Sequence, residues 1–234
     1  MSARTDATRT AARTAGSLTS PAIGESGQDV ATELTVAVLD PETARHPDRL
    51  EEALARREER ATWQPGAGRV ELFRYRDLAI RIASGAAVGS RTSETALAGR
   101  FGARLERPQP FYSRQLVSGP APAEAFSAIV VNRMQPRHSD RVAELFASLD
   151  ATDFPSTMGT RVRRLYSVAP DIYLHVQEFE QVDGLAVIDE AWRDSDPRFL
   201  KICADLTPLV PPYDDTCTTH EDHVARRFHV RSAP

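Results

Sequence analysis

The strongest constraint on the fold of this chain is an internal repeat, in which short motifs recur in the same order in both halves. Residues 46–50 (HPDRL) are matched by residues 138–142 (HSDRV), and each motif opens an amphipathic segment. The later matches pair residues 65–68 with 155–159, 72–73 with 165–166, 77–80 with 171–174, and 110–112 with 227–229. Because chance rarely produces such a collinear series, we interpret the chain as two copies of one structural unit.

The second half shows the order of elements in that unit most clearly. Apolar and β-branched runs predict strands, and apolar residues at helical spacing predict helices. In chain order, we expect a strand at 128–134, a helix at 139–149, a hairpin at 162–179, a helix from about Leu185 to Leu206, and a strand at 224–230. This order, β-α-β-β-α-β, is typical of ferredoxin-like folds.

The first half follows the same order with an abbreviated second helix. We expect strands at 34–39, 70–75, 78–83 and 111–117, with helices at 47–61 and near 93–105. Residues 1–30 hold too few large apolar side chains to offset the entropy of ordering, which predicts a disordered tail. We therefore divide the chain into this tail, a first unit at 31–118, a proline-rich linker at 119–126 and a second unit at 127–234.

Charge and hydropathy exclude two classes of partner. The formal net charge is −4 without a concentrated basic face, which argues against nucleic acid, and no apolar run approaches the ~20 residues of a membrane span. The two cysteines, Cys203 and Cys217, are interpreted as unpaired thiols in a reducing cytoplasm.

A series of motifs in the second half carries a resemblance to a known family. The motifs are Phe146…Asp150, Phe154-Pro155…Gly159, residues 161–166 (RVRRLY), 171–175 (DIYLH), 196–199 (DPRF) and 206–213. This ordered set, which spans Ala128 to Arg231, resembles the tetracenomycin-type aromatic polyketide cyclases, which are small dimeric α+β-barrel proteins. The resemblance implies an α+β fold in which the antiparallel sheets of two tandem ferredoxin-like units pair as an intramolecular dimeric α+β barrel.

The same resemblance implies a chemistry. Family members work without metal or organic cofactor on the free or carrier-bound poly-β-ketone products of a type II synthase. We therefore expect an intramolecular aldol condensation followed by dehydration to an aromatic ring. The implied partners are the polyketide substrate and synthase components or an acyl carrier protein. The chain would act as a monomer with an internal pseudo-dimer, or as a homodimer.

His175 is the leading catalytic candidate, because a side chain with a pKa of about 6.5 serves as both acid and base near neutrality. It lies on a strand where Tyr173, His175 and Gln177 share one face. The sequence leaves open which face of the sheet holds a pocket. The alternative is a hydrogen-bonded core histidine.

Arg163 and Asp150 are expected to assist His175. Arg163 matches an arginine that the family places near its histidine, and a guanidinium can stabilise a developing enolate. The alternative is a solvated cation among Arg161, Arg163 and Arg164, of which the first two should share a face. Asp150 follows Leu149, where the family commonly has a His-Asp pair. That departure argues against a two-histidine mechanism and leaves Asp150 as a helper or as a helix-end residue.

Further residues are predicted to bind substrate or to play no part. Arg161 and an aromatic set, Phe146, Tyr166, Tyr173 and Trp192, are candidates for substrate binding, and the alternative for the aromatic residues is the core. Residues 220–223 (HEDH) resemble metal ligands but lack a third ligand of a recognised motif, so we predict no metal site.

The first unit lacks the candidate pair, because Arg81 stands where the second unit has His175 and Val70 where it has Arg163. We interpret it as a degenerate copy that shapes the structure or the substrate site. Two other functions remain open: a cofactor-independent monooxygenase acting on an anthrone-like ring, and a non-catalytic subunit that binds the nascent polyketide.

Overall fold

A computed structural model describes residues 32–63, 65–90, 92–119, 125–180, 186, 188–190, 193 and 196–233. The predicted tail at 1–30, most of the predicted linker, Leu185 and Trp192 lie outside the described residues.

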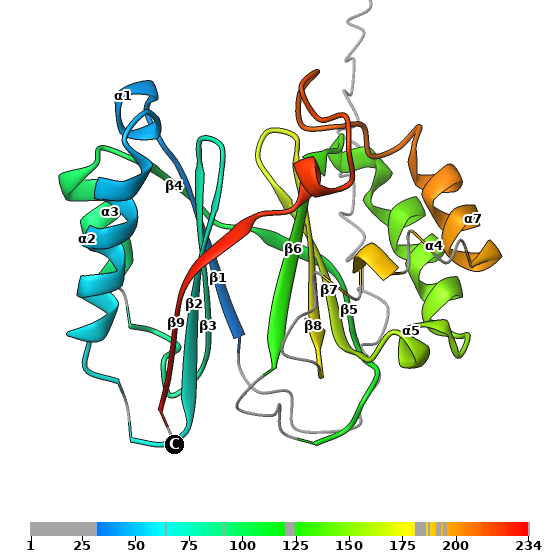
Figure 1. Cartoon of the computed structure of the whole chain (residues 1–234), viewed down its shortest axis with the longest axis horizontal. Coiled ribbons are helices and arrows are strands. Elements are labelled where there is room, and N and C mark those ends of the chain that lie inside the picture. The colour runs from blue at the N-terminus through cyan, green and yellow to red at the C-terminus, as the bar shows by residue number, and fades with distance from the viewer. Residues whose placement is uncertain are drawn as a thin grey trace, which may run out of the picture.

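Two antiparallel sheets face each other, and each carries helices on its outer face (Figure 1). The first sheet has the order β4-β1-β3-β2-β9, with bounds Arg104–Glu106, Thr32–Val38, Leu78–Gly85, Gly68–Tyr75 and Arg226–Ala233. The second has the order β5-β7-β8-β6, with bounds Gln109–Gln115, Thr160–Val168, Ile172–Phe179 and Phe126–Arg133. The predicted α+β fold with two tandem ferredoxin-like units is confirmed.

The helices divide between the two units. The first unit has α1 (Pro41–Ala44), α2 (Pro47–Glu59) and α3 (Thr92–Arg100). The second has η1 (Pro136–His138), α4 (Ser139–Asp150), α5 (Phe154–Thr157), α7 (Pro197–Leu206) and η2 (Glu221–His223). Among the described residues, no helix is long and apolar enough to cross a membrane.

The two units exchange their last strands. β5 leaves the first unit and pairs with β7, whereas β9 leaves the second unit and pairs with β2. Before each exchanged strand, the chain pairs briefly within its own unit. β4 pairs with β1 ahead of β5, and Val224 forms a bridge with Val130 ahead of β9. The sequence predicts both strands, at 111–117 and 224–230, without indicating the sheet that each one joins. The alternation of side chains predicts a strand but does not specify which sheet edge it joins.

The face that each side chain takes on β8 determines where a site can form. Ile172, Leu174 and Val176 belong to the apolar core between the two sheets. Tyr173 belongs to the core between the second sheet and its helices, and His175 is in ring contact with Phe146 of α4. The candidate residues therefore face the helices, which answers the question that the sequence left open.

Candidate functional site

A cavity of about 320 Å³ lies between the second sheet and its helices. Its wall is mainly apolar, with side chains from β6, β8, α4, α5 and α7 that include Phe146, Leu149, Phe154, Phe199 and Ile202. Polar side chains, among them Asn132, Arg163, Tyr173, His175 and Gln177, interrupt this wall. An apolar wall with convergent polar groups is the usual composition of a pocket that binds a small molecule.

Arg163 and His175 meet at one end of the cavity. An N–H at Nη1 of Arg163 donates to Nε2 of His175 over 2.9 Å, and the two residues are 2% and 9% exposed. Because the guanidinium has only donors, Nε2 must accept and Nδ1 must carry the imidazole hydrogen. Burial, reinforced by the Arg163 charge, lowers the pKa of His175 well below its ordinary value. The imidazole is therefore neutral at pH 7.

Asp150 fixes Arg163 from the other side. Nε of Arg163 donates to Oδ1 and Oδ2 of Asp150 over 2.9 and 3.1 Å, and the side chains of both residues are buried. The guanidinium carbon also lies 4.9 Å from the ring centre of Phe146. Among the described residues, Nη2 of Arg163 has no hydrogen-bond partner, so this donor remains free to bind a substrate oxygen.

The exchanged strand β5 also contributes to this site. The Tyr112 hydroxyl donates to Oδ2 of Asp150 over 2.9 Å, and Phe111 lies 6.3 Å from Tyr173 between ring centres. Burial and the neighbouring Asp150 carboxylate raise the pKa of Tyr112, so the hydroxyl stays protonated as a donor. Sequence reasoning missed Tyr112 as a site residue, although the repeat had drawn attention to the segment 110–112.

Tyr173 supplies a hydroxyl without a partner. Its side chain lines the cavity beside His175, is 2% exposed, and its hydroxyl has no hydrogen-bond partner among the described residues. Burial raises the pKa of Tyr173, so the hydroxyl remains protonated. A buried hydroxyl without a partner loses hydration energy, which a ligand oxygen in the cavity would restore.

The other predicted site residues divide between the cavity and other locations. Phe146 and Tyr173 line the cavity, as expected of substrate-binding residues. Tyr166 faces the opposite way and packs in the core between the sheets. Trp192 lies outside the described residues.

Arg161 does not share the face of Arg163, contrary to our expectation. The register of β7 shifts between Thr160 and Val162, so the regular alternation is lost at Arg161. Its guanidinium donates to Glu180 over 3.0 Å and to the carbonyl of Gly119 over 3.0 Å. Arg161 therefore connects β7 to Glu180, directly after β8, and to Gly119.

The first unit seals its equivalent position with an ion pair. Arg81, the counterpart of His175, donates through Nε to Oε1 of Glu58 over 2.9 Å, and Ser93 donates to the same oxygen. Glu58 is 0% and Arg81 1% exposed. Glu58 corresponds to Asp150 in the repeat, because both follow the matched HPDRL and HSDRV motifs at the same spacing. The first unit thus has an acid at the position of Asp150 and an arginine at the position of the cavity-facing imidazole.

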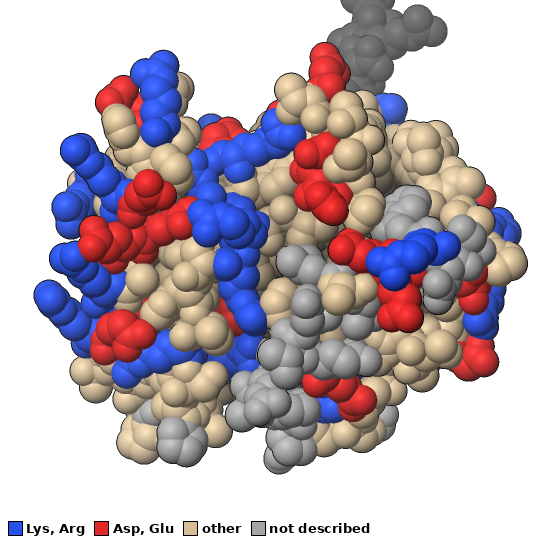
Figure 2. All heavy atoms as spheres, in the orientation of Figure 1, with Lys and Arg blue, Asp and Glu red and all other residues tan. Residues whose placement is uncertain are grey.

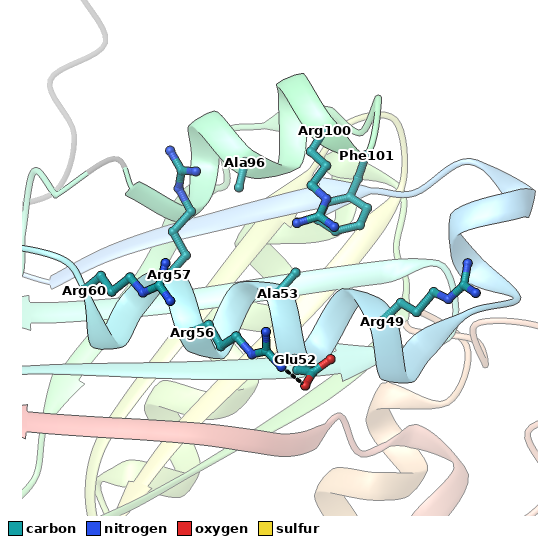
Figure 3. A pocket seen from close by; sticks show the side chains of 9 residues that line it. All are labelled: Arg49, Glu52, Ala53, Arg56, Arg57, Arg60, Ala96, Arg100 and Phe101. Carbon is teal, nitrogen blue, oxygen red and sulfur yellow. Dashed lines mark hydrogen bonds and ion pairs between the residues drawn. The ribbon is translucent and has the colours of Figure 1, made fainter.

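An open hollow of about 630 Å³ lies instead on the surface of the first unit (Figure 3). It runs between α2 and α3, and its lining includes Arg49, Arg56, Arg57, Arg60 and Arg100. Figure 2 shows basic side chains gathered on this side of the molecule. All five arginines are exposed, unlike Arg163, so the hollow is a solvated basic surface rather than an enclosed site.

A further group of polar side chains lines the main cavity. It consists of His223 of η2, His220 directly before η2, and Asn132 of β6. Nε2 of His220 hydrogen-bonds to Oδ1 of Asp189 over 2.7 Å, and Nδ1 of His223 hydrogen-bonds to Oδ1 of Asn132. In the described part of the chain, the ligand atoms of Asp189, His220 and Glu221 lie within 4.8 Å of one another. Since the Asp189–His220 hydrogen bond already accounts for their proximity, we assign no metal to this group.

The second unit of the chain matches a known protein family. Residues 126–231 match the family model of the polyketide synthesis cyclases. Tetracenomycin F2 cyclase of Streptomyces glaucescens is 30% identical over 110 residues, which is 47% of this chain and 97% of that protein. The chain belongs to the polyketide synthesis cyclase family. This assignment gives it a polyketide-related role as an enzyme of the cyclase kind.

Two solved structures are similar to parts of this chain. The structure of tetracenomycin F2 cyclase, described as a type II polyketide cyclase, matches over 47% of this chain and 99% of its own (29% identity, TM-score 0.43). An anthrone oxidase-like protein matches over 86% of this cyclase family member and 92% of its own chain (15% identity, TM-score 0.52). At that identity, the second match establishes a shared fold alone.

Proposed function

We propose that this polyketide cyclase family member closes a ring by intramolecular aldol condensation, followed by dehydration, on an aromatic polyketide intermediate from a type II synthase. The observation that carries the proposal is the 2.9 Å contact between Arg163 and His175 inside an apolar cavity. There, donors fixed by the fold meet a charge that develops on a ketone oxygen, and such preorganised donors stabilise transition states strongly.

The proposed oxygen-binding group has three donors. Nη2 of Arg163, the hydroxyl of Tyr173 and the Nδ1 hydrogen of His175 have no partners among the described residues. Since Asp150 and Tyr112 act through Arg163, we assign them as positioning residues. In this arrangement His175 acts as a hydrogen-bond donor to the substrate oxygen, because its Nε2 lone pair is occupied by Arg163 and Nδ1 carries the hydrogen.

The substrate is proposed to enter as a poly-β-ketone, either free or bound to an acyl carrier protein. Aromatic side chains support this choice of substrate, because Phe146, Phe154 and Phe199 offer flat apolar surfaces to a planar product. The first unit contributes β5 and completes the sheet of the second unit. We therefore propose a monomer whose two units form the functional pair, a state that light scattering measures. An obligate larger oligomer would contradict that part of the proposal.

Product analysis tests the function. A minimal type II synthase is incubated with and without the protein, and the products are separated and identified by mass spectrometry, while an electrode records oxygen. We expect a new aromatised product without oxygen uptake. Protein-dependent oxygen uptake and quinone absorbance would instead identify a monooxygenase, and unchanged products would exclude a catalytic role in cyclisation.

A further inference from the structure

Besides the Arg163–His175 contact, the cavity lining holds a second polar pair, formed by Asn132 of β6 and His223 of η2. On the paired strands, Val130 lies opposite His175 and Asn132 lies opposite Tyr173. Asn132 and His175 are thus diagonal neighbours on one sheet face, and such neighbours lie about 7–8 Å apart. A substrate bound to Arg163 and His175 can therefore also reach His223.

The hydrogen bond to Asn132 determines the tautomer of His223. With the side-chain oxygen of Asn132 as acceptor, Nδ1 of His223 is the donor, and Nε2 keeps its lone pair. Among the described residues, Nε2 of His223 has no partner. This is the state that a general base requires.

The surroundings of His223, burial above all, favour the neutral imidazole. Burial lowers the pKa of His223, and the Asp222 carboxylate partly opposes this, while Arg76 and His220 lower it further. At pH 7 the lone pair on Nε2 is therefore available.

Backbone contacts hold His223 against the second sheet. The next residue, Val224, forms a bridge with Val130, and the amide of Ala225 donates to the carbonyl of Ile129 over 2.8 Å. The amide of His223 itself donates to the carbonyl of His220 over 3.2 Å. The imidazole is thus positioned by the sheet rather than by a free loop.

The other two histidines of the cavity are less suited to act as the base. Nε2 of His175 accepts from Arg163, and Nε2 of His220 donates to the Asp189 carboxylate. Of the three, His223 is the histidine that is bound to β6 through Asn132 and whose Nε2 lone pair has no partner among the described residues.

We propose that His223 is the general base of ring closure, taking the methylene proton on Nε2 while the Arg163 end of the cavity holds the substrate oxygen. The proposal rests on the cyclase function above. The methylene C–H bond breaks, its electron pair becomes an enolate, and the proton moves to Nε2. The enolate carbon then bonds to a ketone carbon, the C=O π pair moves to oxygen, and the proton on Nε2 passes to that alkoxide. Atoms and charge balance without a co-reactant.

Deuterium exchange isolates the proton-transfer step from ring closure. The probe is 2-tetralone, a cyclic ketone fused to one benzene ring, whose methylene between the ring and the carbonyl is activated. Its hydrogen–deuterium exchange in D₂O is followed by NMR. We expect the wild-type protein to accelerate the exchange at this methylene. His223→Gln should lower the protein-dependent rate by about 10²-fold. Added imidazole should restore part of the rate, and His46→Gln, at an exposed histidine, should behave as wild type.

A second variant keeps the test independent of whether His223→Gln folds. Asn132→Asp places a carboxylate against Nδ1 of His223, which raises the pKa of the imidazole. The acid limb of the exchange rate should then move to higher pH. Undiminished exchange in His223→Gln, or an unmoved acid limb in Asn132→Asp, would overturn the role of His223. A wild-type protein that does not accelerate the exchange would also overturn the role of His223. The cyclase function is decided separately, by the product analysis.

Discussion

The Tyr112 hydroxyl donates a 2.9 Å hydrogen bond to Asp150 from a strand that the first unit contributes to the sheet of the second. A chain of contacts runs from this exchanged strand through Asp150 and Arg163 to His175. The geometry of the site in one unit therefore depends on the other, even though the first unit has sealed its own equivalent position with the Glu58–Arg81 pair.

Removing the Tyr112 hydroxyl should affect both stability and rate. Tyr112→Phe loses a hydrogen bond to a charged group, which costs about 1.5–3 kcal/mol of unfolding free energy. Tyr213→Phe is the matched control, because the Tyr213 hydroxyl also donates over 2.9 Å to a carboxylate, that of Asp77, outside the cavity. We expect similar losses in denaturant titrations, with a lower kcat in Tyr112→Phe alone. Equal kcat values for the two variants would refute the positioning role.

Asp150 and Glu58, the buried acids of the two units, allow the effect of removing each carboxylate on stability and activity to be compared. Asp150→Asn and Glu58→Gln each leave a buried arginine without its carboxylate, and breaking such pairs costs about 3–5 kcal/mol. Chemical denaturation should register both losses. Activity per folded molecule should fall in Asp150→Asn and stay near wild type in Glu58→Gln. Loss of activity in folded Glu58→Gln would show that the first unit has a more direct part in the reaction.

The sequence predicts some of these elements correctly and others not. The internal repeat identified the two units, and strand alternation placed His175 and Tyr173 on one face of β8. The bulge at Arg161 broke that alternation on β7, so the expected face of Arg161 was wrong. Tyr112 was missed because its contact with Asp150 arises only when β5 joins the other sheet. His223 was missed as a cavity residue because a short η2 segment carries no periodic pattern that fixes its direction.

The buried imidazole of His175 should make stability depend on pH. Its pKa is lowered in the folded state, so the unfolded chain binds the proton first as pH falls. Stability is therefore complete above about pH 6.5 and is lost below it, by up to about 1.4 kcal/mol per pH unit. Between about pH 6.5, the ordinary histidine pKa, and about pH 5, the unfolding free energy of His175→Gln should fall less steeply than that of the wild type. Identical slopes would mean that His175 keeps an ordinary pKa.

The Tyr173→Phe variant shows whether this hydroxyl acts in the reaction or stabilises the fold. Because its hydroxyl has no partner among the described residues, Tyr173→Phe should leave the unfolding free energy unchanged or raise it. Loss of one donor to a developing oxyanion should lower kcat by about 10²-fold. A destabilised Tyr173→Phe protein with normal kcat would instead indicate a structural hydrogen bond.

The most direct test of the oxygen-binding end is the ionisation of a bound naphthol, whose anion absorbs at longer wavelength than its neutral form. Donors from Arg163, Tyr173 and His175 should lower the pKa of the bound naphthol below its value in water, and Arg163→Gln should remove most of that decrease. A naphthol that binds in the cavity of the wild-type protein and titrates as it does in water would contradict the account.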